Sequence, residues 1–273
     1  MRIFAIGDPH LSLSTPEKSM EPFGPKWHRH AERLAENWRA AIGEDDLVLV
    51  PGDISWALKL DRATTDLEYL GELPGTKVIS KGNHDYWWSS NAKVRAALPA
   101  RMHAVQGEAV RVGRVVVGGT RLWDVPGVDF DGLIDCRPNP LNPDAENSRE
   151  RSEEQVARDL ALYEREVGRL KLALEAIEAE AAEGDLRVVM VHYPPCSATL
   201  EPNELTALFE AHRIDHVVFG HLHSLYDPLP AVPFGERTGV RYHLTSLDYL
   251  DCQPAEIASA PAATPGGTPA AAE

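Results

Sequence analysis

The sequence predicts an α/β fold, in which strands and helices alternate along the chain. Short apolar runs are separated by segments whose apolar residues recur every three or four positions, and this alternation indicates strands joined by helices. Hydrophobic residues make up 43% of the 273 residues and charged residues 25%, proportions that are typical of a globular protein. A chain of this length can bury about three-quarters of its unfolded surface, so it needs no disulfide bonds to be stable.

The expected strands are apolar runs bounded by turn residues or charges. They lie at residues 2–7, 46–50, 77–80, 110–118, 186–191, 216–219 and 241–245. The first run meets Asp8 too soon to be a signal peptide, so we interpret it as a buried strand. The run at 110–118 contains the turn sequence Gly113-Arg114 and therefore holds one or two strands.

Three helices of ordinary length are expected, at residues 27–42, 61–73 and 204–212. In the first, Leu34 and Trp38 lie one turn apart on one face, and Gly43 ends the helix. The second ends at Pro74-Gly75, because proline cannot continue a helix.

A fourth, longer helix is expected at about residues 148–183, and Ser152 with Gln155 predicts a capping box near its start. Its apolar residues are spaced alternately by four and three, and they are Val156, Leu160, Tyr163, Val167, Leu170, Leu174, Ile177 and Ala181. This spacing is typical of a coiled coil, and one reading is a homodimer through residues 156–181. We favour a helix that packs on the protein's own core, because three and a half heptads only just reach the length that indicates a coiled coil.

Three segments show neither pattern. Residues 11–26 and 124–147 are rich in proline or serine, and loops of this length often serve as lids or rims. Residues 254–273 are mostly Ala, Pro, Gly and Thr and can bury little apolar surface, so we expect a disordered tail. The remainder, residues 1–253, is expected to form one domain.

The formal net charge of −15 argues against a protein that grips long nucleic acid or an anionic membrane. The three cysteines, Cys136, Cys196 and Cys252, are not clustered, which favours a reducing compartment over a disulfide framework or a thiolate zinc site. No segment is apolar over the length of a membrane span. We therefore expect a cytoplasmic protein.

Five polar motifs each follow an expected strand. They are Asp8-Pro9-His10, Gly52-Asp53, Gly82-Asn83-His84-Asp85, His192 and Gly220-His221-Leu222-His223. Strand ends of an α/β sheet are where side chains from distant segments converge. Carboxylate, amide and imidazole groups without thiolates suit Mn²⁺, Fe or Zn²⁺, and we favour Mn²⁺. The glycines allow the backbone to turn sharply and to approach an ion closely.

Seven of these residues are candidate metal ligands, which is more than one tetrahedral ion accepts. They are Asp8, His10, Asp53, Asn83, His192, His221 and His223. Two ions that share a carboxylate fit this number, and Asp53 is the natural bridge because a carboxylate has two oxygens. Two divalent cations with Asp8, Asp53 and a bridging hydroxide leave a net charge of about +1, which attracts phosphate.

As an ordered set, the motifs resemble the signature of the calcineurin-like metallophosphoesterases over about residues 1–250. The resemblance implies a β-sandwich flanked by helices, in four α/β/β/α layers, with the site at the strand ends. It implies one ion held by Asp8, His10, Asp53 and His223 and a second held by Asp53, Asn83, His192 and His221. By the same resemblance, His84 would contact the phosphoryl group or leaving oxygen, and Asp85 would hold its ring. The loop at 124–147 and the long helix fall outside the signature and would form an insert that shapes substrate choice.

The resemblance implies hydrolysis of a small phosphate monoester or diester by attack of a metal-bridging hydroxide. Two alternatives remain open: a nuclease or cyclic-nucleotide phosphodiesterase of the same family, and a metal-stabilised scaffold that binds a protein partner without turnover. The net charge disfavours long nucleic acid but leaves a nucleotide open as the substrate. Because ligand histidines must be neutral, we predict loss of metal and of activity as the pH falls below about 6.5.

The remaining aromatic and histidine residues near the motifs receive structural interpretations. His28 and His30 lie at the start of a helix beside the 11–26 loop, where a solvated face is favoured over contact with phosphate. Trp87 and Trp88 are favoured as core residues over a stacking wall for a nucleobase, because large aromatics are usually buried.

Overall fold

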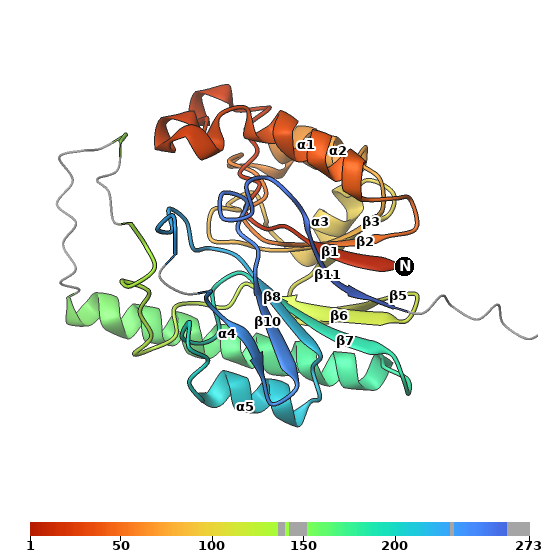
Figure 1. Ribbon diagram of the computed structural model, residues 1–273, viewed down its shortest axis with the longest axis vertical. Coiled ribbons are helices and arrows are strands. Elements are labelled where there is room, and N and C mark those ends of the chain that lie inside the picture. The colour runs from red at the N-terminus through yellow and green to blue at the C-terminus, as the bar shows by residue number, and fades with distance from the viewer. Residues whose placement is uncertain (136–139, 142–151, 230–231, 261–273) are drawn as a thin grey trace, which may run out of the picture.

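A computed structural model describes residues 1–135, 140–141, 152–229 and 232–260 of the chain. Two β-sheets lie face to face between two layers of helices (Figure 1), so the expected four-layer α/β/β/α arrangement is confirmed. No helix in the described ranges combines the length and the apolar character needed to cross a membrane.

Sheet one has the strand order β11-β1-β2-β3-β4. The bounds are Arg2–Ala5 for β1, Leu47–Pro51 for β2, Thr76–Ser80 for β3, Met102–Val105 for β4 and Ala255–Ser259 for β11. Strands β1 to β4 are parallel, and β11 runs antiparallel to β1. Three helices lie on its outer side (Figure 1), and they are α1 (His30–Ala41), α2 (Leu60–Gly71) and α3 (Asn91–Ala97).

Sheet two has the strand order β5-β6-β7-β8-β10-β9. The bounds are Glu108–Val112 for β5, Val115–Thr120 for β6, Leu186–Val191 for β7, His216–Phe219 for β8, Gly235–Arg237 for β9 and Val240–Leu244 for β10. Strands β6, β7, β8 and β10 are parallel, while β5 and β9 pair antiparallel at the edges. Its outer side carries α4 (Glu153–Glu180) and α5 (Glu204–Ala211).

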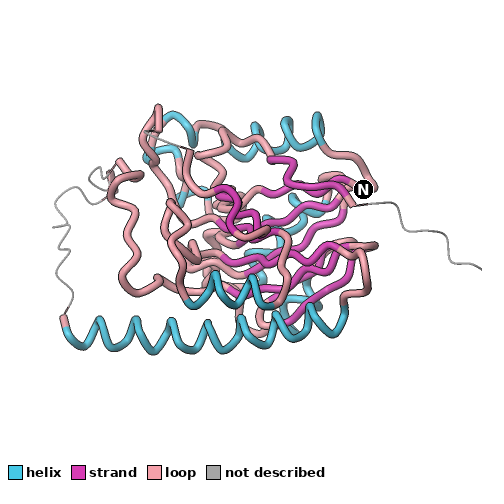
Figure 2. The backbone as a smooth tube through the Cα atoms, turned by 60° about the horizontal axis from the view of Figure 1, so that its bottom comes forward, coloured by secondary structure: helices cyan, strands magenta, loops and turns pink. Residues whose placement is uncertain are grey.

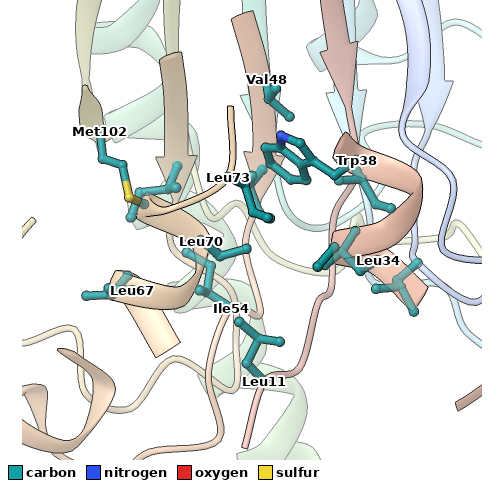
Figure 3. Packing of buried hydrophobic residues seen from close by; sticks show 14 of the residues in the cluster. Leu11, Leu34, Trp38, Val48, Ile54, Leu67, Leu70, Leu73 and Met102 are labelled. Carbon is teal, nitrogen blue, oxygen red and sulfur yellow. The ribbon is translucent and has the colours of Figure 1, made fainter. Parts of the chain in front are cut away.

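Alternation of side chains along the strands divides the interior into three apolar layers. Ile3 and Ala5 of β1 face sheet two, whereas Phe4 faces the helices on the outer side of sheet one. In that outer layer, Leu34 and Trp38 of α1 lie with Leu67 and Leu70 of α2 over the sheet (Figure 3). The three layers hold the two sheets in one orientation, so the loops that follow their parallel strands share one edge.

Several elements differ from the expected ones. Strand β11 lies in the segment expected to be disordered; that expectation was wrong for Ala255–Ser259, because pairing with β1 satisfies the backbone and the side chain of Ile257 is 9% exposed. Residues 261–273 of the expected tail lie outside the described part of the chain. Residues 16–27 hold three short 3₁₀ helices, and they are Pro16–Lys18, Glu21–Phe23 and Pro25–Trp27; α1 therefore begins at His30, three residues later than expected. Helix α3 and strands β4 and β9 had no expected counterpart.

The predicted capping box of α4 is present: the Ser152 hydroxyl accepts from the Gln155 amide at 3.2 Å, and Gln155 Oε1 accepts from the Ser152 amide at 2.8 Å. Only the C-terminal part of the helix is buried, and its covered residues include Val167, Leu170, Leu174 and Ile177. This part packs on sheet two, as favoured from the sequence. A homodimer through residues 156–181 stays a prediction.

Candidate metal centre

The polar motifs converge where parallel strands of both sheets end. The loops after β1, β2 and β3 carry Asp8, His10, Asp53, Asn83 and His84. The loops after β7 and β8 carry His192, His221 and His223. All seven candidate ligands therefore lie at one edge of the sandwich, with members from each sheet.

One group of nitrogen and oxygen atoms surrounds the imidazole of His10. Its Nε2 lies 3.2 Å from His223 Nε2 and 3.5 Å from Asp53 Oδ2, while His223 Nε2 lies 3.9 Å from Asp8 Oδ1. Asp8, His10 and His223 present ligand atoms that are all within 4.8 Å of one another, which is compatible with one ion.

A second group surrounds His192. Its Nε2 lies 2.6 Å from Asn83 Oδ1, 3.3 Å from His221 Nδ1 and 3.4 Å from Asp53 Oδ2. Asp53 Oδ2 therefore lies at similar distances from His10 and from His192, where a carboxylate that bridges two ions would be placed. Ligand atoms of Asp8, Asp53 and His192 also lie within 4.8 Å of one another. The carboxylates of Asp8 and Asp53 therefore lie between the two groups of nitrogen atoms.

The arrangement of the imidazole nitrogens fits bound cations. Nδ1 of His192 faces the carbonyl of Pro51 at 3.0 Å and Nδ1 of His223 faces a carboxylate oxygen of Asp248 at 2.8 Å, so each of these atoms is placed to donate a proton. In that tautomer each Nε2 presents a lone pair to the cluster. The facing Nε2 atoms of His10 and His223 then need a cation or a proton between them, and the donor set is one that accepts Mn²⁺, Fe or Zn²⁺.

The backbone at the cluster is unusual in a way that brings the ligands together. Asp8, His10, Asp53 and His221 all have positive φ angles, of 55°, 41°, 51° and 71°, a region that residues other than glycine rarely adopt. A Cβ atom at Gly82 would overlap the carboxylate of Asp53. The backbone at Gly82 therefore approaches a candidate ligand closely, as expected from the glycines in the motifs.

Burial and neighbouring charges shift the pKa values of the cluster. Burial raises the pKa of Asp8 to about 6 and lowers the pKa values of His10 and His221 well below the usual range. Burial also disfavours the charged form of His192, but the carboxylates of Asp53 and Asp8 outweigh it and raise its pKa to about 9. Cations compete with that proton, because metal-bound histidine must be neutral.

His84 and Asp85 lie beside the cluster in different roles. The backbone N–H of His84 donates to Asp53 Oδ1 at 2.8 Å, and its half-buried ring lies 4.5 Å from the ring of Trp56. Asp85 is fully buried and accepts from the amides of Ile54 and Gly82 and from Trp87 Nε1, at 2.9, 2.7 and 2.9 Å. These bonds join the Asp53 loop to the Asn83 loop, whereas the family resemblance assigned Asp85 to the ring of His84.

Asp248 follows β10, is 3% exposed and was not among the predicted site residues. Its second carboxylate oxygen accepts from the Ser224 amide at 2.9 Å, so both oxygens support the segment that carries His223. A signal was available, since Asp248 follows an expected strand as the other site residues do. Trp27 was also missed; its ring lies 5.7 Å from His10 and 5.4 Å from His223.

The residues given structural interpretations lie away from the cluster or in the core. His28 is exposed, as favoured, and its Nδ1 lies 3.4 Å from Glu21 Oε1. The expected solvated face was wrong for His30, which is buried and whose Nδ1 faces the carbonyl of Trp27 at 3.0 Å. Trp87 and Trp88 are 1% and 4% exposed and belong to the outer apolar layer of sheet one. They are not a stacking wall.

Two sheets with a carboxylate and imidazole cluster at their strand ends define a class of metal-dependent phosphoric ester hydrolases. The family model described as calcineurin-like phosphoesterase matches residues 1–225, and the chain belongs to this family. No curated protein matches the chain.

Two solved structures are similar to the chain over most of its length. One is a protein of unknown function from Aquifex aeolicus, with 11% identity, 93% of this chain and 94% of that chain covered, and a TM-score of 0.43. The other is a phosphopantetheinyl hydrolase from Mycobacterium tuberculosis, with 17% identity, 90% and 88% covered, and a TM-score of 0.49.

Proposed function

We propose that the protein is a phosphohydrolase that uses two divalent cations, held by Asp8, His10, Asp53 and His223 and by Asp53, Asn83, His192 and His221. The observation that carries this proposal is the position of Asp53 Oδ2, 3.5 Å from His10 Nε2 and 3.4 Å from His192 Nε2. When bound, the two ions would supply a hydroxide nucleophile at neutral pH and neutralise charge on a phosphoryl group.

The chain's own residues orient the ligands and handle the proton. The His84 amide holds Asp53 Oδ1, which leaves Oδ2 directed at the two groups of nitrogens. Pro51 and Asp248 direct His192 and His223 with their Nε2 atoms toward the cluster. A ring nitrogen of His84, next to the cluster, would donate a proton to the leaving oxygen, a role worth about 10²–10⁴ in rate.

The substrate proposed is a small phosphate ester. Mn²⁺ is the cation we favour, with Fe and Zn²⁺ as the other forms to be compared. A test reconstitutes the metal-free protein with each cation, measures bound metal per chain, and assays alkyl, aryl, nucleoside and cyclic-nucleotide phosphates and a bis-aryl diester.

The decisive variant is Asp53→Asn, which removes the bridging charge. We expect it to bind fewer than two ions and to lose at least about 10³-fold in kcat/KM. The matched control is Asp185→Asn, the same change at a carboxylate that pairs with Arg111 and Arg114 beside β7. Wild-type turnover in Asp53→Asn would show that Asp53 does not bridge the two ions. If the wild-type protein binds two ions but hydrolyses none of the esters, the scaffold alternative is favoured.

A further inference from the structure

The long helix α4 extends well beyond the sheet on which it packs. Its 28 residues span about 42 Å, whereas the six residues of β7 span about 20 Å. The N-terminal half of α4 projects past the strands on the side where the site loops lie, as both views show (Figures 1 and 2). Burial of the helix begins at Glu166, so the overhang comprises about its first half.

The overhang forms one wall of a cavity of about 610 Å³. Val156 and Leu160, one turn apart on α4, line it although they are 52% and 46% exposed. The segment after β6 supplies the facing wall, with Val128 and Phe130. A volume of this size lies in the range of small-molecule sites.

The cavity adjoins the candidate metal centre through His221. His221 lines it together with Leu222, and the same His221 places Nδ1 3.1 Å from Asn83 Oδ1 in the cluster. A phosphate ester bound at the cluster beside His221 can therefore extend its organic group between the overhang and the segment after β6.

The lining indicates what that organic group is. Apart from His221, the titratable residues among the described lining are carboxylates, and they are Asp124, Asp129, Asp131 and Asp159. The described lining thus offers no lysine or arginine to a second phosphate, while its aliphatic and aromatic side chains gain from covering apolar surface.

We propose that this cavity binds the organic group of the substrate, and that this group is apolar and not anionic, of the alkyl or acyl type. The proposal rests on the phosphohydrolase function, since the phosphoryl group must lie at the cluster. It sets an apolar phosphate ester above a nucleoside di- or triphosphate as the substrate class, because the described lining has no cation for a further phosphate.

The test measures binding and turnover against chain length in the Mn²⁺-reconstituted full chain. Calorimetry gives the affinity of n-alkylphosphonates from methyl to octyl, and n-alkyl phosphates give kcat/KM. We expect affinity to rise about threefold per methylene until the cavity is filled, and at least about tenfold from methyl to hexyl. Affinity and kcat/KM that do not change with chain length would overturn the proposal.

Two leucines on α4 provide a matched pair of variants. Leu160→Gln is expected to lower the hexyl-to-methyl affinity ratio by about threefold to tenfold. Leu172→Gln makes the same change at a leucine that is 57% exposed and outside the cavity, and it should keep the wild-type ratio. Equal loss in both variants would refute a role for the cavity.

Two further outcomes distinguish an apolar substrate site from a failed phosphohydrolase and from a dimer interface. If no ester is hydrolysed but phosphonate affinity still rises with chain length, the phosphohydrolase proposal fails and the apolar site stands. Sedimentation velocity tests the overhang as a contact between two copies of the chain. If Leu160→Gln converts a dimer to a monomer and leaves the chain-length ratio unchanged, the cavity is a dimer interface and the proposal is wrong.

Discussion

Replacement of Asp248 by asparagine should weaken metal binding without a direct change to any candidate ligand. In the wild type, one carboxylate oxygen accepts from His223 Nδ1 at 2.8 Å and the other accepts from the Ser224 amide at 2.9 Å. Asparagine keeps one acceptor but places an N–H donor against the second donor, and it removes the negative charge that stabilises the ring's orientation.

The expected size of the effect follows from these contacts. Loss of a carboxylate that orients a metal-binding histidine costs about 10–100-fold in metal affinity, or about 1.4–2.7 kcal/mol. The same range is expected for one charge-assisted hydrogen bond. Only the ion held by His10 and His223 should be affected strongly, because the carboxylate of Asp248 bonds to the ring of His223 and to the backbone beside it.

Calorimetric titration of the metal-free protein with Mn²⁺ resolves the two binding steps. In Asp248→Asn one step should weaken by the stated factor while the other changes by less than about threefold. Asp185→Asn serves as the control for a buried carboxylate lost elsewhere, and its metal affinities should equal those of the wild type. If both steps of Asp248→Asn stay within a factor of two of the wild type, or both weaken equally, the orienting role is refuted.

Three further predictions concern the cluster, the core and acid stability. Gly82→Ala should abolish binding of at least one ion while far-ultraviolet circular dichroism stays unchanged, since its Cβ would displace the Asp53 carboxylate; two ions bound at wild-type affinity would contradict this. Leu174→Ala should lower the free energy of unfolding in urea by about 2–5 kcal/mol, whereas Val156→Ala should change it by less than about 1 kcal/mol; similar losses would mean that the overhang is also buried. The hydrogen bond from Arg111 lowers the pKa of Asp185 to about 2, below an unfolded value of about 3.9, so its stabilising effect is full above about pH 4 and is lost as the pH falls toward 2. The loss of unfolding free energy caused by Asp185→Asn should therefore shrink as the pH falls from about 4 toward 2. A difference in urea midpoint between the wild type and Asp185→Asn that stays constant over this range would contradict a stabilising contact between Arg111 and Asp185.

The acid sensitivity of metal binding stays a prediction. Metal content and turnover measured between pH 5 and pH 8, about 1.5 units on either side of the ordinary histidine pKa of about 6.5, would test it. Unchanged content and turnover at mildly acidic pH would count against histidine ligation.

Much of the fold could be predicted because strand and helix patterns in this chain are local. Strands β7 and β8 lie at the expected residues, since each is an apolar run with both faces buried. Strand β11 could not be predicted in this way, because Ile257 is the one large apolar residue of Ala255–Ser259 and the strand pairs through its backbone with the distant β1. The division into two sheets entered only through the family resemblance, as periodicity does not specify strand partners.

The candidate site was found by a simple regularity: a polar residue follows an apolar strand. Asp8, Asp53 and His192 share it, and the structure brings them together. Asp248 shares it too but has no adjacent glycine or second ligand to single it out. Trp27 could not have been found, because the turns of residues 16–27 that carry its ring to His10 leave no periodic pattern in the sequence.

The split of the cluster between the two sheets has a consequence for folding. A cation that binds Asp53 from one sheet and His192 from the other recognises only the docked sandwich, so its binding free energy opposes separation of the halves. At a free cation concentration one hundred times its dissociation constant, this linkage adds about 2.7 kcal/mol to the unfolding free energy. Removal of the cations by a chelator should therefore weaken the contact between the two sheets. Hydrogen exchange of the backbone amides should then rise first along β2 and β7, which lie at that contact.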